Sequence, residues 1–324
     1  MDSAIWIVFL AALFAFEVVY FKIASYYGIV DRPNHRTMHQ GETIRGGGIV
    51  FYISILLYAF WQGGLSVYFM AGTSVLAFIS FIDDLHHLPS FLRSLVQVGA
   101  VTALVGSTGF FDWSVPGAVL MVIVFTGALN AYNFMDGING ITGGYSMVFM
   151  LTAYTINQFW ISFVDPYFLW SIIAGLIVFN FFNFRKKARC FAGDIGSITM
   201  AYVVVYLLLL LIKKSGNPVW ILLLSLYGID TVATIIQRIF RRENIFEAHR
   251  LHLFQAGIYK GGWTQLQMAT AFMIVQSVVN LLLICMVFYI PSPSIQWILA
   301  LTMLLVLSVI YAYIKFRVLK IRWL

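Results

Sequence analysis

The segment from Asn130 to Gly144 reads NAYNFMDGINGITGG and lies between two apolar runs that are each long enough to cross a bilayer. Its polar groups need an explanation, because an unsatisfied backbone or carboxylate group near hydrocarbon costs several kcal/mol. Asn130, Asn133 and Asp136 are three residues apart, which places them along one side of a helix. Glycines then end the helix and let the backbone approach a ligand closely. The segment therefore predicts a polar site at the end of a membrane helix.

The composition of the whole chain points to a membrane protein. Of its 324 residues, 61% are hydrophobic and only 10% are charged, whereas charged residues make up roughly a quarter of a soluble domain. The first apolar run, Ser3 to Tyr20, has no basic leader and no small-residue cleavage site, so we expect a retained helix. The sequence predicts an all-α polytopic membrane protein with one integral-membrane domain over residues 1–324.

Eleven segments have the apolar character of a membrane span, for which about 20 residues are needed. The predicted spans are 3–24, 47–63, 65–82, 94–110, 115–132, 141–160, 167–184, 196–213, 218–236, 266–288 and 293–315.

The basic residues set the predicted orientation. With the N-terminus outside, every Lys and Arg except Lys213 and Lys214 falls on the inner side of these spans. Cytoplasmic loops carry such an excess of basic residues, so we expect an outer N-terminus, a cytoplasmic C-terminus and an active site on the cytoplasmic face. The net charge of +7 follows from this topology and from anionic lipid, and calls for no nucleic acid.

Two of the inner loops carry acidic residues next to membrane spans. Asp83 and Asp84 are adjacent in FIDDL, and they repel each other unless a cation lies between them. Such a pair suits Mg²⁺ or a general base, and the alternative is a solvated helix end. Asp194, in FAGDIGS, has small neighbours, as a metal ligand would, while the basic run before it has a topological role.

Two further inner loops suggest phosphate binding. Gly46, Gly47 and Gly48 precede a helix and can present N–H groups to phosphate, although an ordinary helix-entry loop has the same appearance. His249 and His252 are three residues apart, which puts them on one helical face beside Arg250. We favour phosphate over zinc here, because zinc needs at least one more protein ligand.

Two kinds of nucleotide-binding site can be excluded from the sequence. The chain has no G-x-x-x-x-G-K-[ST] loop and no soluble βαβ region for a dinucleotide fingerprint. Any nucleotide must therefore be bound by loops at the membrane face.

Taken together, these loops resemble the polyprenyl-phosphate N-acetylhexosamine-1-phosphate transferases, a family that includes the phospho-N-acetylmuramoyl-pentapeptide transferases. The resemblance covers nearly the whole chain and follows the family's order of motifs. The matching segments are TIRGGG at 43–48, FIDDL at 81–85, NAYNFMDGINGITGG at 130–144, FAGDIGS at 191–197 and HRLHLFQ at 249–255.

The resemblance implies a reaction and its partners. A UDP-N-acetylhexosamine would donate its sugar 1-phosphate to polyprenyl phosphate, releasing UMP, with Mg²⁺ as cofactor and Mn²⁺ as an alternative. The expected location is the bacterial cytoplasmic (inner) membrane, where the first membrane step of cell-surface glycan synthesis takes place. The lipid bilayer and a second copy of the chain in a homodimer are further expected partners.

The resemblance also implies roles for individual residues. Asp83 and Asp84 would act on the acceptor phosphate, one as base and one near the metal, and Asp194 would be the main Mg²⁺ ligand, with Asp83 beside it. The residues expected to contact substrate are Arg45, Asn130, Asn133, Asp136, His249, Arg250 and His252.

The sequence departs from the family pattern at several positions. Ile44 replaces a Pro, His87 a third acid and Asn139 an Asp, which puts any role of a carboxylate at 139 in doubt. The H-R-L-H motif has fewer histidines than the GlcNAc and muramoyl-pentapeptide branches. It is most similar to the branch that starts O-antigen or capsule chains on 6-deoxy sugars such as fucosamine or quinovosamine, and GlcNAc 1-phosphate transfer is the alternative.

A secondary transporter or lipid flippase is the alternative of another class. Transporter sites usually lie near the bilayer midplane on broken helices, often within inverted repeats. Here the acids cluster at one boundary and no repeat is evident, with Glu17 and Asp230 as the mid-helix exceptions.

Overall fold

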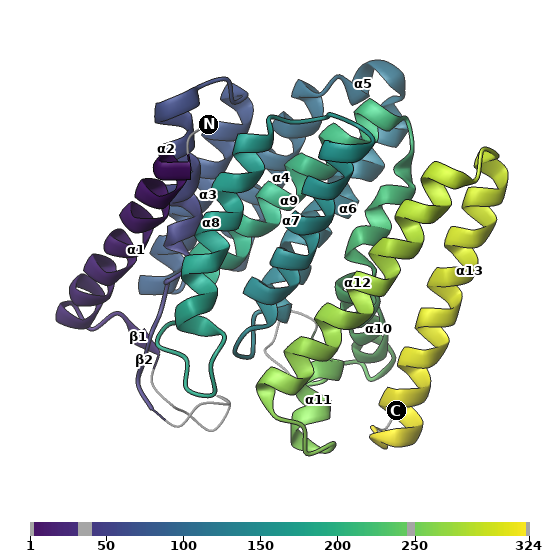
Figure 1. Cartoon of the computed structure of the whole chain (residues 1–324). Helices are drawn as coiled ribbons and strands as arrows, with labels where there is room; N and C mark the ends of the chain where they lie inside the picture. The colour runs from purple at the N-terminus through teal and green to yellow at the C-terminus, as the bar shows by residue number, and fades with distance from the viewer. Residues whose placement is uncertain (1–2, 32–40, 245–249, 322–324) are drawn as a thin grey trace. The chain divides into compact units, whose positions relative to one another are not determined.

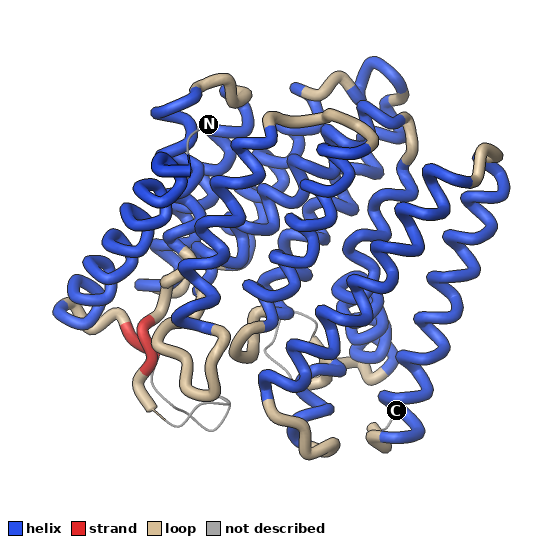
Figure 2. The backbone as a smooth tube through the Cα atoms, viewed as in Figure 1, coloured by secondary structure: helices blue, strands red, loops and turns tan. Residues whose placement is uncertain are grey.

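The computed structural model describes residues 3–31, 41–244 and 250–321 and is built almost entirely of helices (Figure 1 and Figure 2). The chain divides into two compact units, Met1–Gly216 and Asn217–Leu324, and each is described by itself. The all-α polytopic class is confirmed, while the single-domain boundary and the orientation stay predictions.

The first unit contains the helices that precede Gly216 and one two-stranded antiparallel sheet. Its elements are α1 (Ser3–Tyr26), β1 (Val30–Asp31), β2 (Thr43–Ile44), α2 (Ile49–Gln62), α3 (Val67–Leu85), α4 (Ser90–Ser107), α5 (Phe110–Trp113), α6 (Val115–Met135), α7 (Ile141–Phe159), α8 (Pro166–Asn183) and α9 (Gly193–Ser215).

The second unit contains two long helices and several shorter elements. They are the 3-10 helix η1 (Pro218–Leu224), α10 (Ser225–Phe240), α11 (Leu253–Tyr259), α12 (Gln265–Tyr289), α13 (Pro293–Ala312) and the π-helical turn η2 (Tyr313–Val318).

All eleven predicted spans are helical in the described part of the chain. Nine helical stretches there are long and apolar enough to cross a membrane by length and composition. The other two predicted spans correspond to α2, which has only 14 residues, and to α7, which is not among the nine.

Several helices begin with a polar cap followed by proline. Ser114, Asp165 and Ser292 each accept a hydrogen bond from a backbone N–H in the first turn of the helix that follows. Proline suits this turn because its missing N–H would have no partner there in any case. The predicted spans that begin at 115, 167 and 293 agree within one residue with the starts of α6, α8 and α13.

Helix α9 forms the core of the first unit. Of its most apolar 18-residue window, 94% is buried, compared with 22% for α1 and α4. The neighbours that contact it are α2, α3, α4, α6 and α7. Because α9 is enclosed by other helices, the residues at its N-terminus, including Asp194, are held in a fixed environment.

The polar loops of the first unit meet at one end of its helices. Since consecutive helices run in opposite directions, the C-terminal ends of α3 and α6 lie at the same end of the unit as the N-terminal end of α9, beside the β1–β2 hairpin (Figure 1). This end carries the acidic segments that the sequence singles out.

Candidate active site

The first loop and the Asp194 loop are joined by backbone hydrogen bonds. The N–H of Phe191 donates to the carbonyl of Ile44 (2.8 Å), the N–H of Gly47 donates to the carbonyl of Phe191 (2.9 Å), and the N–H of Gly48 donates to the carbonyl of Ala192 (3.1 Å). The expectation that these glycines present free N–H groups to phosphate is therefore wrong for Gly47 and Gly48. Their N–H groups hold the two loops together, which is a contact between residues far apart in sequence.

Glycines let the starts of α2 and α9 approach one another. A Cβ atom added to Gly48 would lie within 3.0 Å of the Cα of Gly196, and the reverse holds for a Cβ atom on Gly196. Gly193 has a φ of +70° and an added Cβ atom would lie 2.5 Å from a carboxylate oxygen of Asp84. Larger residues would therefore push apart the elements that carry the acidic side chains.

Asp84 serves as a cap for α9 from another helix. Its Oδ1 accepts a hydrogen bond from the N–H of Asp194 (2.9 Å), and its Oδ2 accepts one from the N–H of Ile195 (3.0 Å). The residue at the usual capping position, Ala192, has no side-chain oxygen to offer. Both oxygens of Asp84 are thus committed to the helix N-terminus, where a negative charge is favourable.

Arg45 completes the surroundings of Asp84. Its Nε lies 2.7 Å from Oδ1 of Asp84, and its Nη2 lies 3.9 Å from Oδ1 of Asp194. Burial lowers the pKa of the Arg45 guanidinium, but the carboxylates of Asp84 and Asp194 raise this pKa by more, so the side chain stays charged. The first loop therefore contributes a fixed cation to the acidic cluster.

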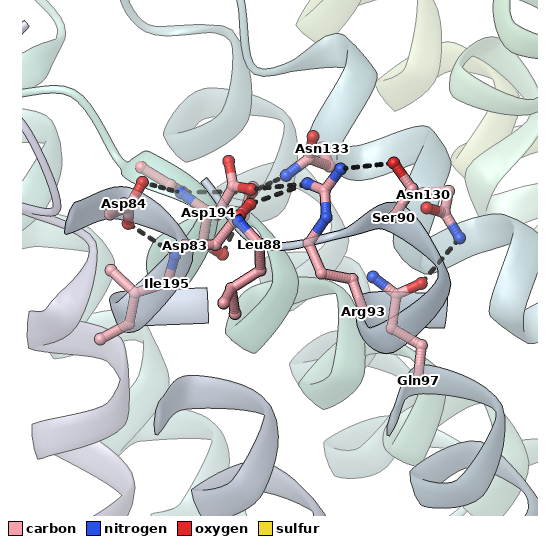
Figure 3. A network of polar contacts seen from close by, with 12 residues as sticks. Asp83, Asp84, Leu88, Ser90, Arg93, Gln97, Asn130, Asn133, Asp194 and Ile195 are labelled. Carbon is pink, nitrogen blue, oxygen red and sulfur yellow. Dashed lines mark hydrogen bonds and ion pairs between the residues drawn. The ribbon is translucent and has the colours of Figure 1, made fainter. Parts of the chain in front are cut away.

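Arg93 contacts the carboxylates of both Asp83 and Asp194 (Figure 3). Its Nη1 is 2.8 Å from Oδ2 of Asp83 and 3.3 Å from Oδ2 of Asp194. Asp83 also accepts a hydrogen bond from the N–H of Leu88 (2.6 Å) through its other oxygen. The carboxyl groups of Asp83 and Asp194 are within hydrogen-bonding reach of one another.

The three acids differ in how far a ligand can reach them. The exposed fraction of the side chain is 0% for Asp84, 4% for Asp83 and 19% for Asp194. Asp194 is therefore the most accessible carboxylate of the cluster. With the cations Arg45 and Arg93 beside three carboxylates, the cluster carries an excess of one negative charge when all five groups are ionised.

Asn133 and Asp136 border this cluster, as the sequence predicts. Asn133 hydrogen-bonds the side chain of Asp194, and its Nδ2 donates to Oγ of Ser197 (3.3 Å). Oδ1 of Asp136 accepts a hydrogen bond from Thr142 (2.6 Å). Burial, and to a smaller extent the charge of Asp84, raise the pKa of Asp136 to about 7, so a nearby cation would keep this carboxylate ionised at neutral pH.

Asn130 is used differently from the other two residues of this segment. Its Nδ2 donates to Oε1 of Gln97 (2.8 Å) and to the carbonyl of Thr126 (3.0 Å), which links α6 to α4 (Figure 3). The structure thus gives Asn130 a packing role, and its predicted contact with substrate stays a prediction.

Asn139, where the family pattern has an acid, supports the loop after α8. The side chain is buried, and its Nδ2 donates to the carbonyls of Arg185 (2.9 Å) and Lys186 (3.4 Å). A carboxylate has no N–H group for these carbonyls, so the amide explains the departure in this chain.

Replacing Asn139 by Asp should therefore destabilise the protein by about 1–3 kcal/mol, because two carbonyls lose their donor and face a carboxylate. Asn157→Asp is the matched control, since Asn157 is also buried but uses its oxygen to accept from the N–H groups of Phe163 and Val164 (2.9 and 3.0 Å). Thermal unfolding in detergent measures both variants. Equal midpoints for the two would contradict this account.

The H-R-L-H segment belongs to the second unit. His249 lies outside the described residues. Arg250 packs over the ring of Tyr259, with 4.8 Å between its Cζ and the ring centroid. His252 is the N-cap of α11, and Arg250 and Leu251 are not helical. The helical face expected to be shared by the two histidines stays a prediction, because one of them is outside the described residues. Their predicted contacts with phosphate or sugar stay predictions.

The most important site residue that sequence reasoning missed is Arg93. The sequence predicts only that this residue lies on the inner side of the membrane, yet its guanidinium contacts two of the predicted site carboxylates. The available signal was its place in the first turn of the helix after Asp83, where a short turn brings it back toward the acid pair.

The carboxylates suit a metal ion that is shared with substrate. Among the described residues, no three His, Cys, Asp or Glu side chains are arranged to hold a metal ion. Mg²⁺ commonly needs only one or two carboxylates, because substrate phosphates and water supply its other oxygen ligands. Asp83 and Asp194, which approach one another at the accessible side of the cluster, provide this donor set.

Comparisons with known proteins find one family model and a group of similar transferases. Residues 66–212 match the model of glycosyl transferase family 4, and this range contains Asp83, Asp84, Asp136 and Asp194. The undecaprenyl-phosphate alpha-N-acetylglucosaminyl 1-phosphate transferase of Escherichia coli (strain K12) is 28% identical over 292 residues, which cover 80% of this chain and 77% of that protein. The probable undecaprenyl-phosphate N-acetylglucosaminyl 1-phosphate transferase of Bacillus subtilis (strain 168) is 27% identical over 253 residues, which cover 72% and 70%.

Proposed function

We propose that this chain, whose residues 66–212 match the model of glycosyl transferase family 4, transfers an N-acetylhexosamine 1-phosphate from a UDP-sugar to polyprenyl phosphate. The acceptor is undecaprenyl phosphate, which the bacterial relatives are named for. The products are UMP and a polyprenyl-diphosphate sugar. The observation that carries the proposal is the cluster of Asp83, Asp84 and Asp194 with two arginines at one end of apolar helices.

The reaction requires charge to be neutralised. An oxygen of the acceptor phosphate attacks the phosphorus that carries the sugar, and the bond from this phosphorus to the oxygen of the departing UMP breaks. Both reactants are anions that repel one another, so cations have to position them. Arg45 and Arg93 are fixed cations beside the accessible face of Asp194 and are suited to bind the phosphates.

The three acidic residues would have different roles in the reaction. Asp194 and Asp83 would hold Mg²⁺, which when bound neutralises charge on the diphosphate and polarises its oxygens. In this proposal Asp83 would also accept a proton from a singly protonated acceptor phosphate. Asp84 acts through backbone contacts, because its oxygens hold the N-terminus of α9 and thereby the position of Asp194.

The proposed location is the bacterial inner membrane, with this end of the first unit in the cytoplasm. Arg45, Arg93 and Arg185 lie at the end of the unit that carries the acids, whereas Lys213 and Lys214 lie in the last turn of α9, at the other end. This distribution supports the cytoplasmic placement. A homodimer stays a prediction from the resemblance alone.

The donor sugar is the finer part of the proposal. The names of the relatives favour a GlcNAc donor, whereas the H-R-L-H motif favours a 6-deoxy-N-acetylhexosamine such as fucosamine or quinovosamine. Both donors call for the same chemistry at the phosphates. They differ only in the group at carbon 6 of the sugar.

Purified protein with undecaprenyl phosphate and Mg²⁺ should release UMP from one member of a panel of UDP-N-acetylhexosamines. The panel holds UDP-GlcNAc, UDP-GalNAc and the UDP forms of N-acetylfucosamine and N-acetylquinovosamine. Removal of divalent metal with EDTA should lower the rate by at least about 100-fold, with recovery when Mg²⁺ or Mn²⁺ is restored. Absence of UMP release with every donor would overturn the proposal, and release that continues in EDTA would overturn the metal assignment.

A further inference from the structure

Helix α1 carries a buried ionisable residue that has no part in the chemistry proposed above. Glu17 has 0% exposure, although only 22% of the most apolar 18-residue window of α1 is buried. Its Oε1 accepts a hydrogen bond from the thiol of Cys190 (3.8 Å), and its Oε2 has no hydrogen-bond partner among the described residues. A buried carboxyl group in a membrane helix is costly and usually functional. The face of α1 that carries it therefore calls for a specific explanation.

The buried side chains of α1 form one stripe along the helix. They are spaced three or four residues apart, as expected for one helical face, and are Phe9, Leu13, Glu17, Tyr20 and Ala24. Two of the five are polar, Glu17 and Tyr20, and they lie about one turn apart. The C-terminal end of α1 leads directly into the β1–β2 hairpin and the first loop of the site (Figure 1). The polar part of the stripe is therefore on the half of the helix that is nearer to the site.

The hydroxyl of Tyr20 binds the backbone of Arg45. It donates to the carbonyl of Arg45 at 2.6 Å, and the tyrosine is buried. On the other side of the residue, the N–H of Arg45 donates to the carbonyl of Ile29 (3.2 Å), which follows α1 in the chain. Gly46 has a φ of +78°, and a Cβ atom added there would lie 2.5 Å from the hydroxyl of Tyr20. The glycine thus lets the hydroxyl approach, and both backbone groups of Arg45 are held by α1 and the segment after it.

The side chain of Arg45 connects this anchored backbone to the candidate active site. Its Nε lies 2.7 Å from Oδ1 of Asp84, and its Nη2 lies 3.9 Å from Oδ1 of Asp194. The side chain is 28% exposed, so a ligand can reach the guanidinium. A guanidinium binds phosphate through N–H groups of fixed direction, so a small shift of its backbone weakens the contact. The hydrogen bond from Tyr20 therefore bears on the position of a cation in the site.

We propose that Tyr20 is a positioning residue that holds Arg45 where its guanidinium binds a phosphate of the substrates. The inference rests on the proposed function, in which Arg45 binds phosphate. Glu17, about one turn earlier, contacts the loop before Asp194 through Cys190, so the same stripe of α1 touches both loops that meet at the site. The donor diphosphate and the acceptor phosphate offer Arg45 the same chemistry, and the kinetic test separates the two sources.

The test is Tyr20→Phe in the purified full chain, with Tyr202→Phe as the matched control. Tyr202 is also buried and donates its hydroxyl to a backbone carbonyl, that of Ala100 (3.1 Å), so both variants keep the ring and lose the same kind of hydrogen bond. Both should lower the thermal midpoint to a similar extent. Only Tyr20→Phe should raise a KM, by about fivefold, while kcat stays within about twofold of the native value. A rise for the UDP-sugar assigns Arg45 to the donor diphosphate, and a rise for undecaprenyl phosphate assigns it to the acceptor.

A double-mutant cycle with Arg45→Gln then identifies the residue through which Tyr20 acts. Arg45→Gln removes the guanidinium and should raise the same KM by more than Tyr20→Phe does. Tyr20→Phe should add nothing further in the Arg45→Gln chain, because no guanidinium remains to be positioned. Where turnover is too slow to measure, the rise of the thermal midpoint on addition of Mg²⁺ with UDP, or of undecaprenyl phosphate, gives the same comparison, since a ligand stabilises the folded chain in proportion to its binding.

The outcomes separate this inference from the proposed function. If both KM values stay native in Tyr20→Phe, or if Tyr202→Phe raises them equally, the hydrogen bond of Tyr20 has only a structural role and the inference is overturned. A further rise of KM when Tyr20→Phe is added to Arg45→Gln would overturn it as well. A native chain that releases no UMP from any UDP-sugar would overturn the proposed function, whereas an active native chain with any of the preceding results would overturn this inference alone.

Discussion

Replacing Asp194 by Asn should lower the rate of UMP release by about 100- to 1,000-fold while the thermal midpoint stays near that of the native chain. The side chain of Asp194 is the most exposed of the three clustered carboxylates, so it is the one that a substrate-bound cation can reach. Asparagine has nearly the same shape but no charge. The loss should therefore appear in kcat, with a higher Mg²⁺ concentration needed for half-maximal activity.

The fold should survive this change because backbone groups make the contacts that hold the start of α9. The N–H of residue 194 still donates to Asp84, and Gly48 still donates to the carbonyl of Ala192. Arg93 also keeps its ion pair with Asp83 at 2.8 Å. The change removes a charge and leaves the scaffold of the site in place.

Two further variants make the result specific. Asp112→Asn changes an exposed carboxylate in the first turn of α5 and should keep full activity. Asp84→Asn alters the residue that caps α9 and should lower the thermal midpoint as well as the activity, because one of its two oxygens becomes a donor facing an N–H group. Near-native UMP release from Asp194→Asn would refute the assignment of the accessible carboxylate.

The sequence could predict the helices and the meeting of the acidic loops. The membrane spans can be predicted because hydropathy is a local property of the sequence. Every second connection between spans lies on the same side of the membrane. Asp83 and Asp194 are therefore expected at one end of the helices, although more than 100 residues separate them. Their contact through Arg93 agrees with this expectation. Membrane topology supplies here the long-range information that sequence patterns in soluble proteins rarely contain.

The different contacts of the individual site residues could not be predicted, because they depend on segments that are distant in the sequence. Adjacent Asp83 and Asp84 are chemically identical in the sequence, yet one contacts Arg93 and the other caps α9. In the same way, nothing local to Gly47 and Gly48 reveals that their N–H groups bind the backbone of residues 191 and 192. At the start of α11, the N–H of Leu253 likewise donates to Asp230 on another helix, a contact that no local pattern reveals.

Replacing Gly48 by Ala should destabilise the protein by about 3 kcal/mol and abolish most of the activity, because α2 and α9 approach closely at this residue. The added Cβ atom would lie within 3.0 Å of the Cα of Gly196 and of the carbonyl oxygen of Ala192. Both are backbone atoms, so no side-chain rotation can relieve the overlap. The two segments must move apart, which would draw Arg45 away from Asp84, its partner at 2.7 Å.

Gly99→Ala is the matched control for this replacement. Gly99 lies within α4, and a Cβ atom there would meet nothing within 4 Å. Because alanine favours a helix over glycine by about 1 kcal/mol, this variant should be as stable as the native chain or slightly more stable. Thermal unfolding and UMP release, measured for both variants in the same detergent, test the predicted differences in stability and activity. If Gly48→Ala unfolds at the same temperature as Gly99→Ala, the contact between α2 and α9 does not hold the two loops of the site together.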